Sequence, residues 1–189
     1  RLKQMDNLPN QMFYTGIGSR QTPIIWRDVF STIGTFLFVE YGLILRSGAA
    51  DGADTFFEKT DGPKHIYLPS FHFNSRQHDG ITYFKPQPEI TQRNETLIPL
   101  CCPHWDRIKR PNVKNLLLRN MSQVLGHNPE QHVLSKFVLC WTPNGEYIGG
   151  TRYALACADL FNVPIFNFGN YTTDNYEPDF FDFIERVMT

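Results

Sequence analysis

The chain has 189 residues and a formal net charge of −1 at pH 7, and 41% of its residues are hydrophobic while 20% are charged. These values are typical of one globular domain with a sizeable core, and they argue against a disordered chain. A net charge near zero creates no overall field that would attract nucleic acid or an anionic membrane, so such a partner would need a local basic patch.

Cysteine use and hydropathy indicate a soluble protein of a reducing compartment. None of the four cysteines belongs to a C-x-x-C pair, and Cys140 and Cys157 lie in apolar stretches, where cysteine acts as a small core residue. We recognise no secretory signal and no apolar run long enough to span a bilayer. We therefore expect a cytoplasmic location, no membrane partner and a single domain over residues 1–189.

The chain opens with a polar stretch, 1–11, for which we expect an N-terminal arm. Beyond it, short apolar runs that predict strands alternate with segments of helical spacing. Thr22 and Pro23 are typical of a helix start, as cap and first-turn residue, and Gly126 is typical of a helix end. The predicted strands span 12–17, 43–46, 65–68, 136–141 and 163–168, and the predicted helices span 22–40, 55–59, 89–100, 113–125, 151–161 and 178–189.

Two segments carry further expectations. Residues 70–88 are polar, aromatic and interrupted by glycine and proline, so we expect an irregular loop that serves as a lid, an insertion or a dimer arm. In the C-terminal helix, Phe180, Phe181 and Ile184 are expected to dock on the body. The 16 phenylalanines are interpreted mainly as core, and the Phe-rich C-terminus together with Trp26 also suggests a homodimer contact.

The alternation of strands and helices predicts an α/β fold, with a mostly parallel sheet of about five or more strands and helices on both faces. In such sheets ligands bind at the carboxyl ends of the strands, near the point where the strand order reverses. Three loops rich in small residues each follow a predicted strand. We therefore expect these loops to converge on one edge of the sheet.

The first loop, Gly16-Ile17-Gly18-Ser19-Arg20, combines glycines that permit close approach, a hydroxyl group and a bidentate donor for phosphate. Gln21 stands where the dinucleotide fingerprint G-x-G-x-x-G has its third glycine, so the fingerprint is incomplete. A tight turn with a surface arginine is an equally good interpretation.

The second loop, Ser47-Gly48-Ala49-Ala50-Asp51-Gly52-Ala53-Asp54, joins a strand to a helix. Small residues ahead of a helix N-terminus favour a phosphate, because free N–H groups and the positive end of the helix dipole face the ligand. We interpret Asp51 as a helix cap. For Asp54, capping and contact with ribose hydroxyls carry equal weight.

The third loop runs from Trp141 to Thr151 and ends in Gly149-Gly150-Thr151 directly before a helix. It again offers backbone N–H groups, a hydroxyl and a helix N-terminus to a phosphate. A plain N-cap role for Thr151 is the alternative. Three such loops after three strands are much less expected by chance than one.

These motifs resemble, in order, those of the DprA/Smf family. Ile17-Gly18-Ser19-Arg20 is similar to its V-G-S-R, and the second loop is similar to its S-G-x-A-x-G-I-D. Arg119-Asn120 resembles its P-x-R-N-R segment, and Gly150-Thr151 with Val163-Pro164-Ile165-Phe166 resembles its closing stretch.

The resemblance covers residues 13–168 and implies the Rossmann-like three-layer sandwich shared by DprA and the Lonely Guy (LOG) nucleotide phosphoribohydrolases, together the SLOG superfamily. Compact single-domain versions of this kind are familiar from bacteriophage genomes. The resemblance therefore also implies a phage source and the host cytoplasm as the location.

Two departures from the resemblance bear on function. LOG enzymes carry P-G-G-x-G-T-x-x-E with a catalytic glutamate, whereas here Thr151 is followed by the non-acidic residues 152–154. DprA proteins bind single-stranded DNA, and residues 105–119 do combine five cations with Trp105, but we prefer to interpret them as a solvated helix face.

We therefore expect binding of a nucleotide or nucleotide-derived small molecule, as a sensor or sequestering protein, with no cofactor. The first alternative is a nucleotide N-glycoside hydrolase, for which Glu146 is preferred over Asp54 and Glu58. The second is a mediator that binds single-stranded DNA.

No metal site is expected, because the histidines and cysteines lack the usual zinc spacing. Catalytic residues stay open, and the predicted ligand-binding residues are Gly16, Gly18, Ser19, Arg20, Ser47, Gly48, Gly52, Asp54, Arg119, Gly149, Gly150 and Thr151.

Overall fold

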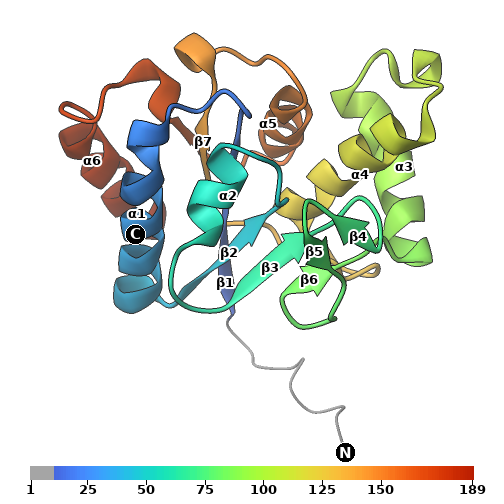
Figure 1. Cartoon of the computed structure of the whole chain (residues 1–189), viewed down its shortest axis with the longest axis horizontal. Coiled ribbons are helices and arrows are strands. Elements are labelled where there is room, and N and C mark those ends of the chain that lie inside the picture. The colour runs from blue at the N-terminus through green and yellow to red at the C-terminus, as the bar shows by residue number, and fades with distance from the viewer. Residues whose placement is uncertain (1–10) are drawn as a thin grey trace, which may run out of the picture.

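The structure is a computed structural model that describes residues 11–189, so most of the expected N-terminal arm lies outside the described residues. A six-stranded sheet runs through the molecule in the order β6-β3-β2-β1-β7-β8, and every neighbouring pair is parallel. Helices cover both faces of this sheet (Figure 1). The fold is therefore the expected α/β, Rossmann-like three-layer sandwich.

The elements follow the expected order along the chain. The strands of the main sheet are β1 (Met12–Gly18), β2 (Leu43–Ser47), β3 (Lys64–Tyr67), β6 (Tyr83–Phe84), β7 (Val138–Trp141) and β8 (Ile165–Asn167). The strands of a separate hairpin are β4 (His72–Phe73) and β5 (Arg76–Gln77). The helices are α1 (Arg27–Tyr41), α2 (Ala53–Glu58), α3 (Pro88–Cys101), α4 (Pro111–Leu125), α5 (Thr151–Leu160) and α6 (Glu177–Met188).

The strand order reverses between β1 and β7. From β1 the chain adds β2, β3 and β6 outward on one side, and it then returns to place β7 and β8 on the other. β1 and β7 pair from Thr15 with Val138 to Gly18 with Trp141, so both strands end together. This carboxyl edge is where parallel sheets of this kind bind ligands.

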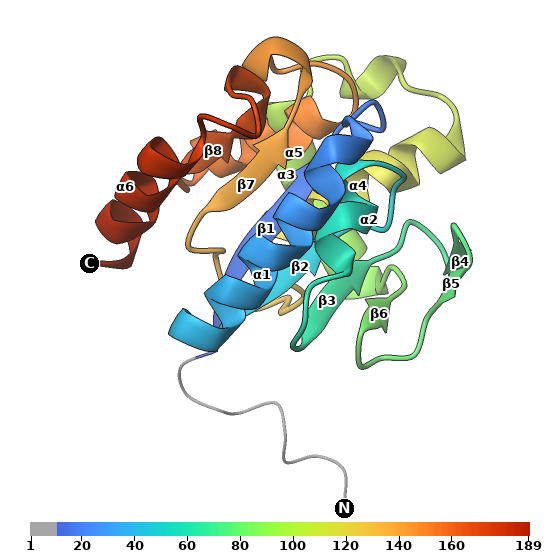
Figure 2. The ribbon, with the colours of Figure 1, turned by 60° about the vertical axis from the view of Figure 1, so that its left-hand side comes forward.

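Side chains alternate between the two faces of the sheet, as the pleat requires. In β1, Tyr14 belongs to the buried cluster beneath α1, α2 and α6, whereas Ile17 belongs to the cluster beneath α3, α4 and α5. Figure 2 shows α1 and α2 in front of the strands and α4 and α5 behind them. The sheet therefore separates two apolar cores.

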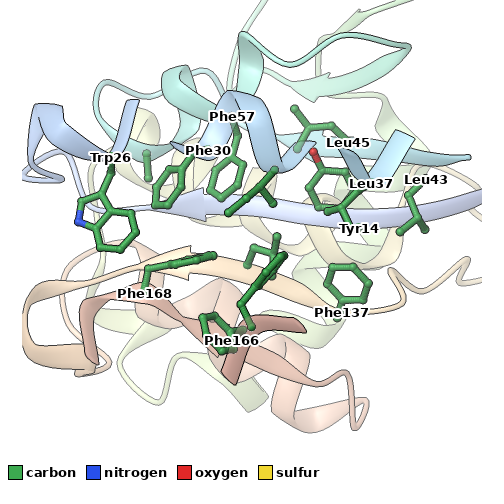
Figure 3. Close-up of a cluster of buried hydrophobic side chains, with 14 of the residues drawn as sticks. Tyr14, Trp26, Phe30, Leu37, Leu43, Leu45, Phe57, Phe137, Phe166 and Phe168 are labelled. Carbon is green, nitrogen blue, oxygen red and sulfur yellow. The ribbon is translucent and has the colours of Figure 1, made fainter. Parts of the chain in front are cut away.

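Aromatic rings fill the first core (Figure 3). Phe30 stacks on Phe57 with ring centroids 4.3 Å apart, and Phe168 packs against both Phe30 and Trp26. Such pairs add ~0.5–1.5 kcal/mol beyond the area that they bury. Trp26 is 3% exposed, so its ring is part of this core and offers no dimer contact, contrary to expectation.

Two arginines hold the C-terminal end of α4. Arg46 is 2% exposed and donates to the carbonyl oxygens of Val124 (3.3 Å) and Val133 (2.5 Å), while Arg93 donates to that of Gly126 (2.8 Å). Within residues 11–189 neither arginine forms an ion pair. Carbonyl groups at a helix C-terminus carry partial negative charge, which stabilises the guanidinium groups there.

Two helix expectations need correction. Thr22 does not cap α1, because its hydroxyl donates to the Ser19 carbonyl oxygen (2.6 Å) and a 3₁₀ turn over Ile24–Trp26 precedes the helix. In α6, Phe181 is 49% exposed, and Phe183 is buried beside the expected Phe180 and Ile184. Positions three and four apart share a helix face, so position 181 is rotated away from the core.

Residues 70–88 are more regular than expected. The hairpin β4–β5 turns through Asn74 and Ser75, whose φ angles of 46° and 63° suit a two-residue turn. The strand β6 pairs with β3 and forms one edge of the main sheet. Strands of two residues contain too few side chains to produce a recognisable period in the sequence.

The same segment is fastened to α2 through one carboxylate. Arg76 donates to both oxygens of Glu58, at 3.2 Å from Nε and 2.5 Å from Nη2. The hydroxyl of Tyr83 donates to Glu58 Oε1 at 2.7 Å. Glu58 therefore links the hairpin and the edge strand to the helix that follows the second loop.

Candidate functional site

The three small-residue loops meet at the carboxyl edge of β1, β2 and β7, as expected. Ser19 N donates to the Trp141 carbonyl oxygen (2.9 Å), which joins the first loop to β7. Ala53 N donates to the Ser19 carbonyl oxygen (3.3 Å), which joins the second loop to the first.

Two consecutive residues of α4 reach the second and third loops. Arg119 Nη1 donates to the carbonyl oxygen of Gly48, and Asn120 Nδ2 donates to that of Gly150 (3.0 Å). Both side chains are at least nine-tenths buried, with 8% and 7% exposure. One helix therefore positions the two loops relative to each other.

Asp54 lies buried between the first two loops. Its Oδ1 accepts from Gly18 N (3.1 Å) and its Oδ2 accepts from Ala50 N (3.3 Å). Burial raises the pKa of Asp54 to about 6, although Arg119 and the two N–H groups act in the opposite direction. The Asp54 carboxylate therefore accepts hydrogen bonds from two loop amides that were expected to bind a phosphate.

The hairpin β4–β5 lies over the second loop. Asn74 Nδ2 donates to the Ala49 carbonyl oxygen and to Asp51 Oδ1, each at 2.9 Å. The ring of Phe73 has its centroid 5.6 Å from Cζ of Arg119. Residues 72–77 therefore cover the guanidinium that holds Gly48.

The glycines of the first two loops are required by close packing. A Cβ atom at any of Gly16, Gly18, Gly48 and Gly52 would overlap other atoms of the chain, and at Gly18 these include the carbonyl of Trp141. Gly52 also has a φ of 85°, which disfavours any other residue. The packing of the chain explains these glycines, and their contact with a ligand stays a prediction.

The glycines of the third loop, unlike those of the first two, are not closely packed. No atom lies within 4 Å of a Cβ built on Gly149 or Gly150, and both residues are exposed. The N–H groups of Gly149, Gly150 and Thr151 donate to no residue in the described part of the chain. These free amides lie at the N-terminal end of α5, where the helix dipole is positive.

Both predicted serines are already bound to the backbone. The buried hydroxyl of Ser47 donates to the Gly16 carbonyl oxygen (2.6 Å), and Ser19 Oγ accepts from Gln21 N (3.0 Å). Ser47 therefore fastens β2 to β1, and Ser19 closes a turn.

The predicted Arg20 and Thr151 side chains are free for a ligand. Arg20 is exposed and makes no hydrogen bond or ion pair with residues 11–189. Its charge acts to lower the pKa of Arg119, so the two guanidinium groups are close enough to interact. The Thr151 hydroxyl, too, has no partner among the described residues.

Gln123 is a further polar residue at this site that was not predicted from the sequence. This residue is 2% exposed, on the same side of α4 as Arg119 and Asn120, and its Nε2 lies against Gly48. The signal was present, because polar residues at positions 119, 120 and 123 share one face of a helix whose neighbours are apolar.

The candidate carboxylates differ in their freedom. Asp54 is bound to loop amides, and Glu58 is bound to Arg76 and Tyr83. Glu146 is exposed on the third loop, and its side chain has no partner within residues 11–189. Of the three, it alone is free to approach a ligand.

The basic segment lies at the other end of α4. Lys114 Nζ lies 5.0 Å from the centroid of the Trp105 ring, so a cation already occupies one face of that ring. Arg107, Lys109 and Arg110 are exposed. A DNA base that stacks on this face of Trp105 would have to displace Lys114.

Two surface hollows are lined by other segments of the chain. One of about 420 Å³ lies between β8 and α6 and is lined in part by Asp179, Asp182 and Arg186. The other, of about 480 Å³, lies between α1 and the end of α2 and is lined in part by Phe36 and Lys59. Neither contains a predicted site residue.

No group of three or more His, Cys, Asp or Glu residues in the described range is placed to hold a metal ion. All four cysteines are free and buried, which agrees with a core role for Cys140 and Cys157. Across residues 11–189, no helix combines the length and the apolar character needed to cross a membrane.

The chain matches no known family model, no curated protein and no solved structure.

Proposed function

We propose that the protein binds a phosphorylated small molecule of nucleotide type at the carboxyl edge between β1 and β7. The observation that carries this proposal is the exposed turn Gly149–Thr151, whose N–H groups are free at the start of α5. Asn120 fixes the carbonyl group of Gly150. A helix N-terminus with free amides favours a phosphate.

The positive charge of nearby arginine side chains favours binding of an anionic ligand at this edge. The Arg119 guanidinium interacts with the Asp54 carboxylate and with Arg20, and Arg20 itself forms no ion pair with residues 11–189, so its positive charge is available to a ligand. Arg20 follows β1 and the glycine turn follows β7, so the two flank the reversal of strand order. Arginine suits a phosphate because its planar fork donates two hydrogen bonds at once.

The nucleotide assignment rests on the sequence. The three loops resemble those of DprA and LOG proteins in order and in character. No acid follows Thr151 at the position of the LOG glutamate, which favours binding without turnover, as in a sensor or a sequestering protein.

Two variants test the phosphate contacts. Arg20→Ala removes an exposed guanidinium, and Gly150→Asp places a carboxylate in the open space at the start of α5. We expect each to weaken binding of nucleoside monophosphates at least tenfold in equilibrium dialysis. Arg27→Ala, which removes an exposed cation of α1 paired with Asp28, serves as the matched control and should bind like the wild type.

Unchanged affinity in both variants would exclude this site. Because a negative charge near a helix N-terminus is stabilising by about 0.3–1 kcal/mol, Gly150→Asp should fold at least as well as the wild type. Loss of binding in that variant would therefore report on the ligand contact and not on the fold.

Hydrolysis is the second candidate, and the free Glu146 on the third loop favours it. Cleavage of an N-glycosidic bond needs a carboxylate near the sugar. Incubation with adenosine monophosphate followed by chromatography should then release free adenine, and Glu146→Gln should abolish the release. Intact nucleotide after incubation would support binding without turnover.

A further inference from the structure

Gln123 is a buried polar side chain that the folded chain leaves without a partner. The residue is 2% exposed. Its backbone carbonyl oxygen accepts from the Thr15 hydroxyl, but its side-chain amide forms no hydrogen bond with any of residues 11–189. Neither Nε2 nor Oε1 is among the fully enclosed polar atoms that lack a partner, so both atoms remain within reach of water or of a ligand.

Several residues close to Gln123 in α4 are apolar, whereas its own side chain lies beside Arg119 at Gly48. Its neighbours on α4, Met121, Val124 and Leu125, are fully buried in the second core. Polar groups that a fold does not need are characteristic of functional sites. The position therefore points to a hydrogen-bond partner that is absent from the chain itself.

The amide of Gln123 lies at the carboxyl end of β2. A Cβ on Gly48 would overlap both Gln123 Nε2 and Arg119 Nη1, so the two side chains meet at the second loop. Asn120, three residues earlier on the same face of α4, uses Nδ2 to hold Gly150 and has no partner for Oδ1 within the described chain. Two amide groups thus lie between the second loop and the open turn of the third.

We propose that Gln123 is a specificity-determining residue that hydrogen-bonds a hydroxyl of the ligand's sugar, and that Asn120 Oδ1 accepts from the neighbouring hydroxyl. The inference rests on the proposed function, in which the phosphate lies at Gly149–Thr151. The sugar is the neutral group attached directly to the phosphate in a nucleotide, so it is the first part that can extend from the exposed turn to α4.

The chemistry of the amide fits this assignment. A carboxamide offers one acceptor and two donors, and a vicinal diol offers both functions in return. A site built to hydrogen-bond a hydroxyl rejects the analogue that lacks it, because the buried amide is then left unpaired.

The test compares ribose 5-phosphate with 2-deoxyribose 5-phosphate by isothermal titration calorimetry. We expect the wild type to bind the ribose compound about tenfold more tightly, a ratio typical of one lost hydrogen bond to a buried group. Gln123→Met should bind both compounds equally, at the level of the deoxy compound. Gln92→Met, at an exposed glutamine of α3, is the matched control and should keep the wild-type ratio.

A stability measurement separates this role from a structural one. Without ligand, Gln123→Met should unfold at a urea concentration no lower than the wild type does, since no side-chain hydrogen bond is lost. Should the variant fail to fold, the side-chain NH₂ resonance of Gln123 in ¹⁵N-labelled wild type must shift with ribose 5-phosphate and stay unchanged with inorganic phosphate.

The outcomes distinguish the two proposals. A wild type that binds neither sugar phosphate contradicts the proposed function itself. A wild type that binds both sugar phosphates with equal affinity, or a Gln123→Met variant that keeps the ratio, overturns the assignment of Gln123 and leaves the phosphate site intact.

Discussion

Asp54 accepts hydrogen bonds from two backbone N–H groups that the sequence analysis assigned to a bound phosphate. Sequence patterns could not distinguish this use from helix capping or ribose contact, because all three need a carboxylate near a helix start. The partner amides belong to Gly18, 36 positions earlier, and to Ala50. Only the pairing of β1 with β2 brings Gly18 close to Asp54, so a local sequence pattern could not predict this hydrogen bond.

The pH dependence of unfolding tests the state of Asp54. Burial holds the pKa of Asp54 in the folded protein at about 6, above its usual value of 3.8. The folded state therefore binds this proton more tightly, and stability is lost as the pH rises from 4 through 6, by up to about 3 kcal/mol. Urea unfolding of wild type and Asp54→Asn at pH 4.5 and 7.5 should show the wild type gaining relative stability at the lower pH. A difference that does not vary with pH would contradict the buried, perturbed carboxyl.

The glycines of the three loops should respond differently to alanine. Gly18→Ala forces a methyl group against the Trp141 carbonyl, and overpacking of this kind costs ~1–3 kcal/mol. Gly150→Ala meets open space at a φ of −68°, so we expect a change in unfolding free energy within about 0.5 kcal/mol. Equal losses in chemical denaturation would mean that the third-loop turn is packed and not open.

At the scale of elements, the strong periodic segments were predictable and the short ones were not. β1, β2, α3, α4 and α5 lie within a few residues of their predicted bounds, because each has an apolar face long enough to define a period. The hairpin β4–β5 has two residues in each strand and depends on the distant Glu58, so its sequence reads as a loop.

The Glu58 contacts should control the opening of residues 70–88. Glu58→Gln weakens the hydrogen bonds from Arg76 and Tyr83, at a cost of roughly 1 kcal/mol to local stability. Amide hydrogen exchange in β4, β5 and β6 should then accelerate about fivefold while α5 stays protected. Glu95→Gln, at an exposed position of α3, is the control. Exchange that is unchanged by Glu58→Gln would show that the segment is held by other contacts.

At the scale of the whole molecule, the parallel sheet explains how much of the site was predictable. The convergence of the three loops follows from strand direction alone and is confirmed by the hydrogen bonds that join them. Strand direction did not predict which loops are packed and which is open, because tertiary packing decides whether a glycine faces protein or open space. The polar face that contains Gln123 was visible in the sequence, but the lack of a partner for its side chain is a property of the assembled fold.

Acid stability of the whole fold depends on His65. Burial lowers its pKa to about 3, with His127 and Arg46 acting in the same direction. The unfolded chain protonates this histidine near pH 6.5, so stability is present above that pH and is lost as the pH falls toward 3. Replacement by His65→Gln should reduce the acid-induced loss in urea unfolding between pH 7.5 and 5. An equal loss in wild type and variant would show that His65 has the same charge in the folded and unfolded states over this pH range.

The most direct test of the phosphate site is a map of backbone amide shifts. Uniformly ¹⁵N-labelled protein is titrated with adenosine monophosphate and followed by two-dimensional NMR. We expect the largest saturable shifts at the amides of Gly149, Gly150 and Thr151, with a shift of Arg20 Nε at the same ligand concentration. Saturable shifts confined to other residues, such as those around the hollow between β8 and α6, or no shift at these amides, would contradict it.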